Sequence, residues 1–308
     1  MMITGADRLR PGWETLPSEL RARIIAAIGG TYVSDAPAHG GFSAGYAGVV
    51  TTSAGRAFVK ACAADWHADS RHFVQQEIEI LALLPPTIAP AVIAAIDGLA
   101  GTALVIEAID GRHPGDPWAV DDLHAIAAVL GRLATTPAPV GMVGAEARLV
   151  PGFTRWRDIA ADTRLLGGLP HSLRNRMPDL LHLEKSFQAA VTGDVIVHDD
   201  VRADNILIRH HRAHLLDWPH ARRGAAWIDV PGLLPSIEAS GGPRCEDAWR
   251  IFEEHGAPPA EALLTVTSGF ASYFWFWQGQ ADIPELPGLR AFQRAQAVPA
   301  LRWLTTML

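Results

Sequence analysis

The stretch from Val195 to Trp218 carries the residues whose types and spacing could do chemistry. His198, Asp200 and Asn205 lie within eight residues of one another, and Asp217 follows twelve residues after Asn205. Apolar runs flank these polar residues, which is the pattern of short strands that end in acids. Carboxylate and amide oxygens are the ligands that a hard divalent cation prefers. The stretch therefore predicts a metal site beside a reactive carboxylate.

The pattern His-x-Asp-x-x-x-x-Asn gives its members separate tasks. The carboxylate of Asp200 could accept the proton of an incoming hydroxyl group, and the amide oxygen of Asn205 could hold a metal that is bound to a nucleotide. The next two apolar runs, Ile206–Ile208 and His214–Leu216, predict a hairpin that delivers Asp217 as a second ligand for Mg²⁺. The spacing favours phosphoryl transfer.

Asp and Asn are also common turn residues. Turn formation alone explains Asp199 and Asp204, and we expect both to be bystanders, with Asp199 facing solvent. Turn formation does not explain the spacing of His198, Asp200 and Asn205 together with Asp217 at the end of the following predicted hairpin.

A glycine-rich segment lies upstream, from His39 to Gly45. Gly41 and Gly45 would let the backbone approach a phosphate, and Ser43 adds a hydroxyl group. A simple hairpin turn explains the same residues. Neither a Walker motif nor a dinucleotide-binding fingerprint is present, so this segment alone indicates nucleotide binding only weakly.

Lys60 interrupts an otherwise apolar predicted strand, and a buried ammonium group needs a partner. The predicted helix Ala68–Leu84 offers Glu77, which shares a helical face with Phe73 and Ile80. A lysine on the third strand that pairs with a glutamate on the next helix positions nucleotide phosphates in kinase-like enzymes. A snorkelling lysine and a solvated glutamate are the alternative. The glycine segment upstream favours the functional pair.

The elements around these residues predict two lobes. Residues 1–109 are expected to form an N-terminal nucleotide-binding lobe, and residues 110–308 a C-terminal catalytic and substrate-binding lobe. An adenine ring would lie against the backbone of Glu107, Ala108 and Ile109, next to the connector. The first lobe should hold a helix over 17–28, the helix over 68–84, and a small, mostly antiparallel sheet of the strands Tyr32–Val33, Val49–Thr52, Ala57–Cys62, Ala91–Ile96 and Leu104–Ile109.

The second lobe is expected to be mainly helical. Pro137–Pro151 reads as a loop. One of the predicted helices contains five consecutive aromatic residues, Tyr273–Trp277, for which packing in a core is a simpler explanation than stacking on a substrate. The expected helices are Asp121–Ala134, Phe153–Leu166, His171–Val191, Gly241–Glu254, Pro259–Gln278 and Gly288–Leu308.

Composition limits the class of protein. Of 308 residues 49% are hydrophobic and 19% charged, so a large core can form. The net charge of −7 argues against nucleic acid as a partner. Two cysteines are too few for a disulfide framework, and neither a signal peptide nor a membrane-spanning run is recognisable. A cytoplasmic monomer or homodimer with no membrane partner is expected.

Together these motifs resemble the aminoglycoside phosphotransferase and choline kinase family, small-molecule kinases with a two-lobed, protein-kinase-like α+β fold. The resemblance implies that Asp200 is the catalytic base, with His198 and Arg202 in the same loop. It also implies Mg²⁺ ligands at Asn205 and Asp217. The glycine segment matches the family's nucleotide loop, and Lys60 and Glu77 match its phosphate-positioning pair. Asp229 resembles an acid that buttresses the catalytic loop.

Two departures from the family pattern are informative. Asp199 stands where the family usually has glycine. Trp218 and Pro219 replace the Phe-Gly that follows the metal-binding acid in protein kinases, and no Ala-Pro-Glu motif follows. A regulated loop for protein substrates is therefore not expected, and a small molecule is the better acceptor.

The expected reaction uses ATP, or alternatively GTP, with Mg²⁺ to phosphorylate a hydroxyl group of a small molecule by direct transfer. An antibiotic acceptor, with resistance as the outcome, is the first choice on family grounds. A metabolic kinase for a sugar, amino alcohol or homoserine-like acceptor is the alternative. A nucleotide-binding protein without turnover is the non-enzymatic alternative, which the intact set of Asp200, Asn205 and Asp217 disfavours. From Val230 onward eight acids stand against five arginines, only a modest excess for a polycationic aminoglycoside.

Overall fold

The computed structural model describes residues 10–38, 45–66, 68–115, 117–283 and 288–308. They divide into two compact units. The sheet unit contains the described residues up to Arg112 together with His214–His220. The helical unit contains His113–Ala213 and Ala221–Leu308. The acid Asp217 thus belongs to the sheet unit although it follows the catalytic loop in sequence.

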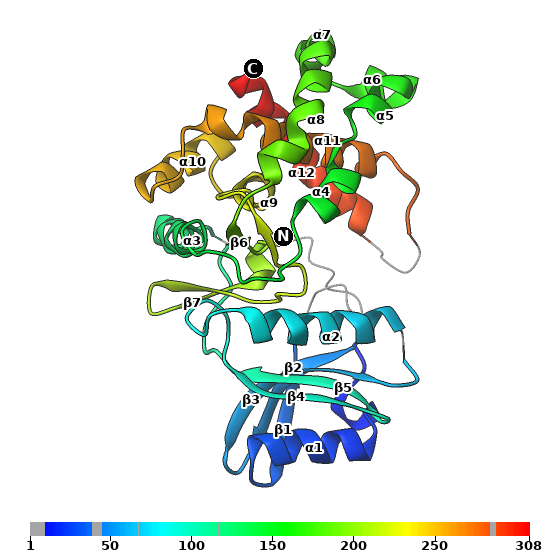
Figure 1. Ribbon diagram of the computed structural model, residues 1–308, viewed down its shortest axis with the longest axis vertical. Coiled ribbons are helices and arrows are strands. Elements are labelled where there is room, and N and C mark those ends of the chain that lie inside the picture. Colours follow the sequence, from blue (N-terminus) through cyan, green and yellow to red (C-terminus); the bar gives the residue numbers. More distant parts are fainter. Residues whose placement is uncertain (1–9, 39–44, 67, 116, 284–287) are drawn as a thin grey trace. The chain divides into compact units, whose positions relative to one another are not determined.

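The sheet unit is built on a five-stranded antiparallel sheet (Figure 1). Its spatial order is β1-β2-β3-β5-β4, in which β3 and β5 are central. Short turns join β2 to β3 and β4 to β5, so consecutive strands pair as hairpins. The strands are β1 (Tyr32–Pro37), β2 (Tyr46–Thr52), β3 (Gly55–Ala63), β4 (Val92–Gly98) and β5 (Gly101–Glu107).

Two helices cover opposite faces of this sheet, α1 (Ser18–Ile28) and α2 (Ala68–Leu83) (Figure 1). Successive side chains of a strand point to opposite faces. Val59 and Ala61 of β3 are buried in the core that α1 helps to form. Lys60, between them, therefore points to the face that carries α2.

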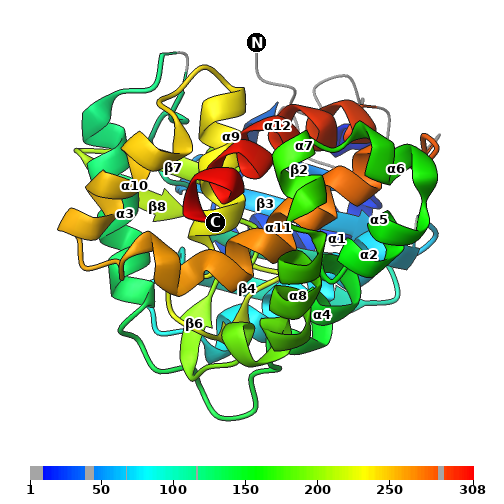
Figure 2. The ribbon, with the colours of Figure 1, turned by 90° about the horizontal axis from the view of Figure 1, so that it is seen from above.

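The helical unit has a hydrophobic core where α11 and α12 pack side by side (Figure 2). Large side chains such as Trp156, Leu173 and Leu301 are almost completely buried there. The helices of this unit are α3 (Val120–Leu133), α4 (Glu146–Phe153), α5 (Trp156–Ala161), α6 (Thr163–Gly168), α7 (His171–Asn175), α8 (Met177–Val191), α9 (Val230–Ala239), α10 (Cys245–Glu254), α11 (Leu264–Gln278) and α12 (Leu289–Met307).

Short strands frame the predicted catalytic loop. Strand β6 (Val195–Val197) pairs with β9 (Arg222–Gly224), and β7 (Ile206–Arg209) pairs with β8 (Arg212–Leu215) as the predicted hairpin. The loop between β6 and β7 ends in a 3₁₀ turn, Ala203–Asn205. No helix of the described residues is long and apolar enough to cross a membrane.

Three predicted segments of the helical unit, two helices and one loop, are wrong in detail. The segment Phe153–Leu166 is not one helix, because the side chain of Asp162 accepts hydrogen bonds from two following backbone N–H groups and begins α6. The segment His171–Val191 is divided at Arg176, where a new helix starts with proline in its first turn. The end of the predicted loop Pro137–Pro151 belongs to α4.

A substitution at Gly269 of α11 would test how closely α11 packs on α8. A Cβ atom at this position would overlap the ring of Phe187 on α8, whereas one at Gly167 in α6 would meet nothing within 4 Å. We expect Gly269→Ala to lower the free energy of unfolding by about 1–3 kcal/mol because the core has no space for a methyl group. Gly167→Ala should raise it by about 0.5 kcal/mol through the unfolded state. Urea unfolding measures both, and equal midpoints would contradict this packing.

Candidate active site

Lys60 is at the centre of the polar group in the sheet unit. Its Nζ atom lies 2.5 Å from Oε2 of Glu77 and 2.6 Å from Oδ1 of Asp217. Glu77 is almost fully buried, and its Oε1 accepts a hydrogen bond of 3.1 Å from the backbone N–H of Trp218. The side chain of Asp217 is 42% exposed. One ammonium group thus joins a buried carboxylate to one that solvent and ligands can reach.

Electrostatics keep this lysine charged. Burial by itself lowers the pKa of Lys60, but the carboxylates of Asp217 and Glu77 outweigh burial and raise the pKa above its usual value. Burial raises the pKa of Glu77, and the Lys60 ammonium group opposes that rise. A permanently charged ammonium group is suited to hold phosphate oxygens.

Glu77 lies on the buried face of α2 with Ile80, as the helical pattern predicts. Phe73 does not, because 39% of its surface is exposed and its ring packs edge-on against His220 with centroids 5.6 Å apart. The prediction for Phe73 is therefore wrong, although the face that carries Glu77 is as predicted.

In the helical unit, Asp229 holds the catalytic loop through its backbone. Its Oδ2 accepts from the N–H of His198 at 2.9 Å, and its Oδ1 accepts from the N–H of Asp199 at 2.7 Å. Asp229 and His198 are both buried. Burial raises the pKa of Asp229, and the two N–H donors and the charge of His198 oppose that rise. One carboxylate thus fixes two consecutive peptide groups directly before Asp200.

Asp200 and Asn205 are in contact within this loop. Asn205 Nδ2 donates to Oδ2 of Asp200 at 3.0 Å and to its backbone carbonyl at 2.9 Å. The side chain of Asp200 is 24% exposed, so its carboxylate is accessible. Arg202 forms a two-pronged hydrogen bond with Asp204 and places its Nη1 atom 3.9 Å from Oδ1 of Asp200. The loop therefore presents an oriented carboxylate with a cation near it.

Asp199 is not the solvent-facing bystander that the sequence predicts. Its side chain is 3% exposed, and its Oδ2 atom lies 2.9 Å from Nη1 of Arg148 in α4. Burial raises the pKa of Asp199 to about 7, and Arg148 opposes this rise. The backbone at residue 199 has a φ of 61°, in the left-handed region, which is uncommon for a residue other than glycine.

Asn205 and Asp217 have the donor chemistry that a magnesium ion requires. The amide nitrogen of Asn205 is engaged with Asp200, which identifies the other end of the amide as its acceptor oxygen. Asp217 offers a carboxylate oxygen from an accessible position. No cluster of three or more acidic, histidine or cysteine side chains suited to a metal occurs among the described residues.

The remaining predicted nucleotide-binding residues are in and around β2 and β5. Glu107 ends β5, and its carboxylate accepts from the N–H of Ala91 at 2.9 Å. Ala108 and Ile109 follow it and are half-buried. A Cβ atom at Gly45 would come within 2.8 Å of the carbonyl oxygen of Ala61, so close packing on β3 requires glycine there. Gly41 and Ser43 lie outside the described residues.

Two arginines near the predicted catalytic loop, Arg148 and Arg222, were not predicted from the sequence. Arg148 pairs with Asp199, and the charge of Arg222 in β9 also acts on that carboxylate. No motif marks either residue. The contact joins residues 51 positions apart, so only the folded chain reveals it.

Solved structures identify the class of fold. This chain is similar to the choline kinase of Streptococcus pneumoniae (TM-score 0.56, 16% identity, 92% of this chain and 98% of that one). It is also similar to a microcompartment-associated aminopropanol kinase (0.59, 17%, 94% and 98%) and to a spectinomycin phosphotransferase solved with ADP and spectinomycin (0.57, 13%, 94% and 98%). The fold is that of the protein-kinase-like small-molecule kinases, as predicted.

The sequence narrows this class further. Residues 37–264, about three quarters of the chain, match the family described as "Phosphotransferase enzyme family", and the chain belongs to that family. No curated protein matches the sequence. The predicted resemblance is confirmed, and the chain is a small-molecule phosphotransferase.

The pKa of Asp199 predicts a pH-dependent stability. The folded chain binds this proton more tightly than the unfolded chain, whose aspartates titrate near 3.8. Stability is therefore lost as pH rises from about 4 to about 7, and Asp199→Asn removes this titration. We expect wild-type stability to fall relative to Asp199→Asn across that window and the difference to stay constant above it. Urea unfolding over the pH series measures this, and parallel profiles would contradict it.

Proposed function

We propose that this chain transfers the γ-phosphoryl group of ATP to a hydroxyl group of a small molecule, with Asp200 as the general base. The observation that carries the proposal is the hydrogen bond of Asn205 to the accessible carboxylate of Asp200, on a loop whose backbone Asp229 holds. An oriented carboxylate can accept the hydroxyl proton during transfer. GTP is the alternative donor.

The proposal gives each half of the site its own task. Lys60 holds phosphate oxygens of the nucleotide and keeps its position through Glu77. Asn205 and Asp217 hold Mg²⁺, which when bound neutralises charge on the phosphates. His198 is buried and serves the loop through its backbone, whereas Arg202 places positive charge beside the base.

The residue types of the loop support direct transfer of the phosphoryl group from the nucleotide to the acceptor. Residues 198–205 include no serine, threonine, cysteine or lysine, and both cysteines of the chain are buried. His198 is buried too, and the proposal gives Asp200 the role of base, so neither is assigned as the nucleophile. The nucleophile is then the acceptor hydroxyl itself, in line with the leaving nucleotide.

For the acceptor, we propose a hydroxylated antibiotic first, with resistance as the outcome and the cytoplasm as its place. The similar spectinomycin phosphotransferase supports this choice, since its structure contains an antibiotic. The aminopropanol kinase supports the alternative, an amino alcohol or another metabolite.

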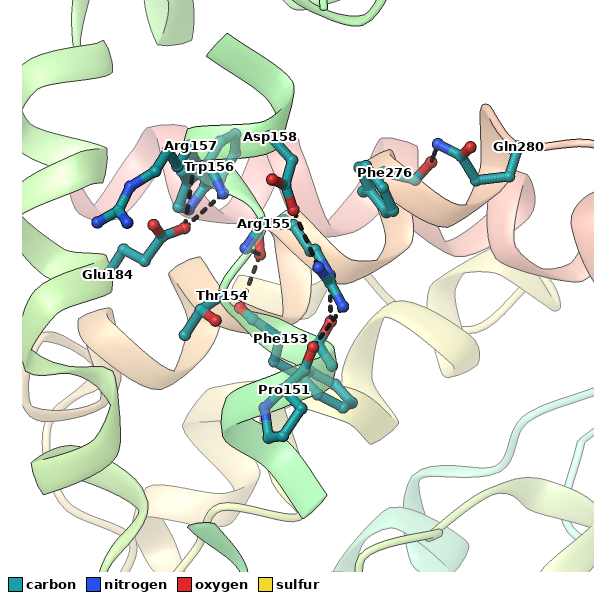
Figure 3. Close-up of polar contacts among 12 residues, drawn as sticks. Pro151, Phe153, Thr154, Arg155, Trp156, Arg157, Asp158, Glu184, Phe276 and Gln280 are labelled. Atoms are coloured by element: carbon teal, nitrogen blue, oxygen red, sulfur yellow. Dashed lines mark hydrogen bonds and ion pairs between the residues drawn. The ribbon is translucent and has the colours of Figure 1, made fainter. Parts of the chain in front are cut away.

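Two arginines of the helical unit, one before and one after the loop in sequence, favour an acceptor with less positive charge than a classical aminoglycoside. The Arg155 guanidinium lies 5.1 Å from the ring centre of Phe276 and 5.6 Å from that of Trp277, and Arg290 lies 5.4 Å from Trp277. Arg155 also donates to carbonyl groups at the end of α4 and pairs with Asp158 (Figure 3). Two guanidinium groups stacked on one indole would repel a polycation.

The decisive experiment incubates purified protein and Mg-ATP with a panel of acceptors. Aminoglycosides, spectinomycin, nucleoside and peptide antibiotics, macrolides, simple sugars and amino alcohols are followed by mass spectrometry for one added phosphoryl group. Addition to an antibiotic supports the first choice, and addition only to a sugar or amino alcohol supports the alternative. ATP binding without transfer to any acceptor or to water would contradict the enzymatic proposal.

Replacing the base should separate binding from chemistry. We expect Asp200→Asn to lower kcat by about 10²–10⁴-fold, because general base catalysis contributes that much. ATP affinity, measured by calorimetry, should stay within about twofold because Lys60 is unchanged. Undiminished transfer by a folded Asp200→Asn variant would refute the role of Asp200.

Replacing Lys60 should act mainly on nucleotide use. We expect Lys60→Met to raise the KM for ATP by about tenfold or more, because charge-assisted hydrogen bonds to phosphate are lost. The matched control is Lys185→Met, which changes the chain's other lysine, an exposed residue of α8. Equal ATP KM values for the two variants would show that Lys60 does not hold the nucleotide.

A further inference from the structure

We propose that Asp199 and Arg148 form a positioning pair that sets the direction of the Asp200 carboxylate. The inference rests on the proposed role of Asp200 as the base. Arg148 lies in α4, outside the motif that identifies the loop, so no sequence pattern reveals the pair.

The backbone of residue 199 makes the pair necessary. Its φ of 61° is in the left-handed region, which glycine adopts freely and which aspartate tolerates better than most residues. Its N–H group is bound by Asp229 at 2.7 Å. Unlike glycine, aspartate has a side chain at this position, and that side chain is buried.

Arg148 holds both ends of residue 199. Its Nη1 atom lies 2.9 Å from Oδ2 of the Asp199 side chain and donates to the backbone carbonyl of Asp199 at 3.4 Å. That carbonyl belongs to the peptide group that leads into Asp200. Asp229 binds the peptide group before residue 199, and Arg148 binds the peptide group after it. These two contacts fix the backbone at residue 199 and therefore the orientation of the Asp200 side chain.

Charge makes each partner depend on the other. Asp229 and Asp200 both repel the buried carboxylate of Asp199, and Arg148 and Arg222 offset this repulsion. Without Arg148, the Asp199 carboxylate would be poorly compensated beside the base. Without Asp199, the Arg148 guanidinium would be left to attract Asp200. Either loss disturbs Asp200, and once one partner is lost the other no longer helps to position it.

A double-mutant cycle tests the pair without knowledge of the acceptor, because water can replace it. The measured quantity is γ-phosphoryl transfer from Mg-ATP to water by wild type, Asp199→Gly, Arg148→Met and the double variant. We expect each single change to lower kcat by about tenfold with an unchanged KM for ATP. The double variant should lose no more than about tenfold in total, because a pair that one substitution has already broken cannot be lost a second time.

Controls separate positioning from general stability. Arg157→Met removes an exposed arginine of α5 and should leave kcat unchanged. Asp199→Asn keeps a residue that tolerates the left-handed backbone but removes the charge, so it should resemble Asp199→Gly if charge is what matters. Thermal unfolding shows that each variant is folded. Losses that multiply in the double variant, or single variants with wild-type kcat, would overturn the proposal.

Asp200→Asn in the same assay distinguishes the two possible failures. If it transfers phosphate to water as fast as wild type, the proposed function itself fails. If it is inactive but the losses of the two single variants multiply in the double variant, only the positioning pair fails.

Discussion

The catalytic loop depends on one buried carboxylate, that of Asp229. It accepts hydrogen bonds from two consecutive backbone N–H groups, those of His198 and Asp199. Hydrogen bonds to a charged acceptor contribute about 1.5–3 kcal/mol each, enough to hold residue 199 in a left-handed conformation that would otherwise be unfavourable. The position of Asp200, and through it the contact with Asn205, follows from this constraint.

Much of this arrangement could be predicted from the sequence, because it obeys local rules. The alternation of β3 places Lys60 on the face that carries α2, and the helical period places Glu77 on the buried side of α2. The loop motif and the acid after the hairpin are recognisable by spacing alone. These features depend on neighbours a few residues away, which a sequence displays directly.

The burial of Asp199 could not be predicted in the same way. An aspartate in a turn normally faces water, and the contact with Arg148, which offsets part of the cost of burial, joins residues 51 positions apart. Arg148 lies in a segment with prolines and glycines that suggests a loop, although its end forms α4. The division of the predicted helices has a related cause: one capping residue, Asp162, outweighs an otherwise continuous helical period.

The residues proposed for the reaction lie mostly in one short stretch, whereas those proposed to influence the acceptor come from separate segments of the helical unit. Arg155, Trp277 and Arg290 come from three segments and meet only in the folded helical unit. Similar structures at 13–17% identity carry the names of kinases for quite different small molecules. Family membership therefore establishes the phosphotransferase reaction.

The most direct test of the central constraint is the rate of phosphoryl transfer from Mg-ATP to water by Asp229→Asn. An amide can accept only one of the two N–H groups and turns its own N–H₂ toward the other. The account predicts a fall in kcat of at least about tenfold, with ATP affinity unchanged and the chain folded. A folded Asp229→Asn variant that transfers phosphate at the wild-type rate would contradict it.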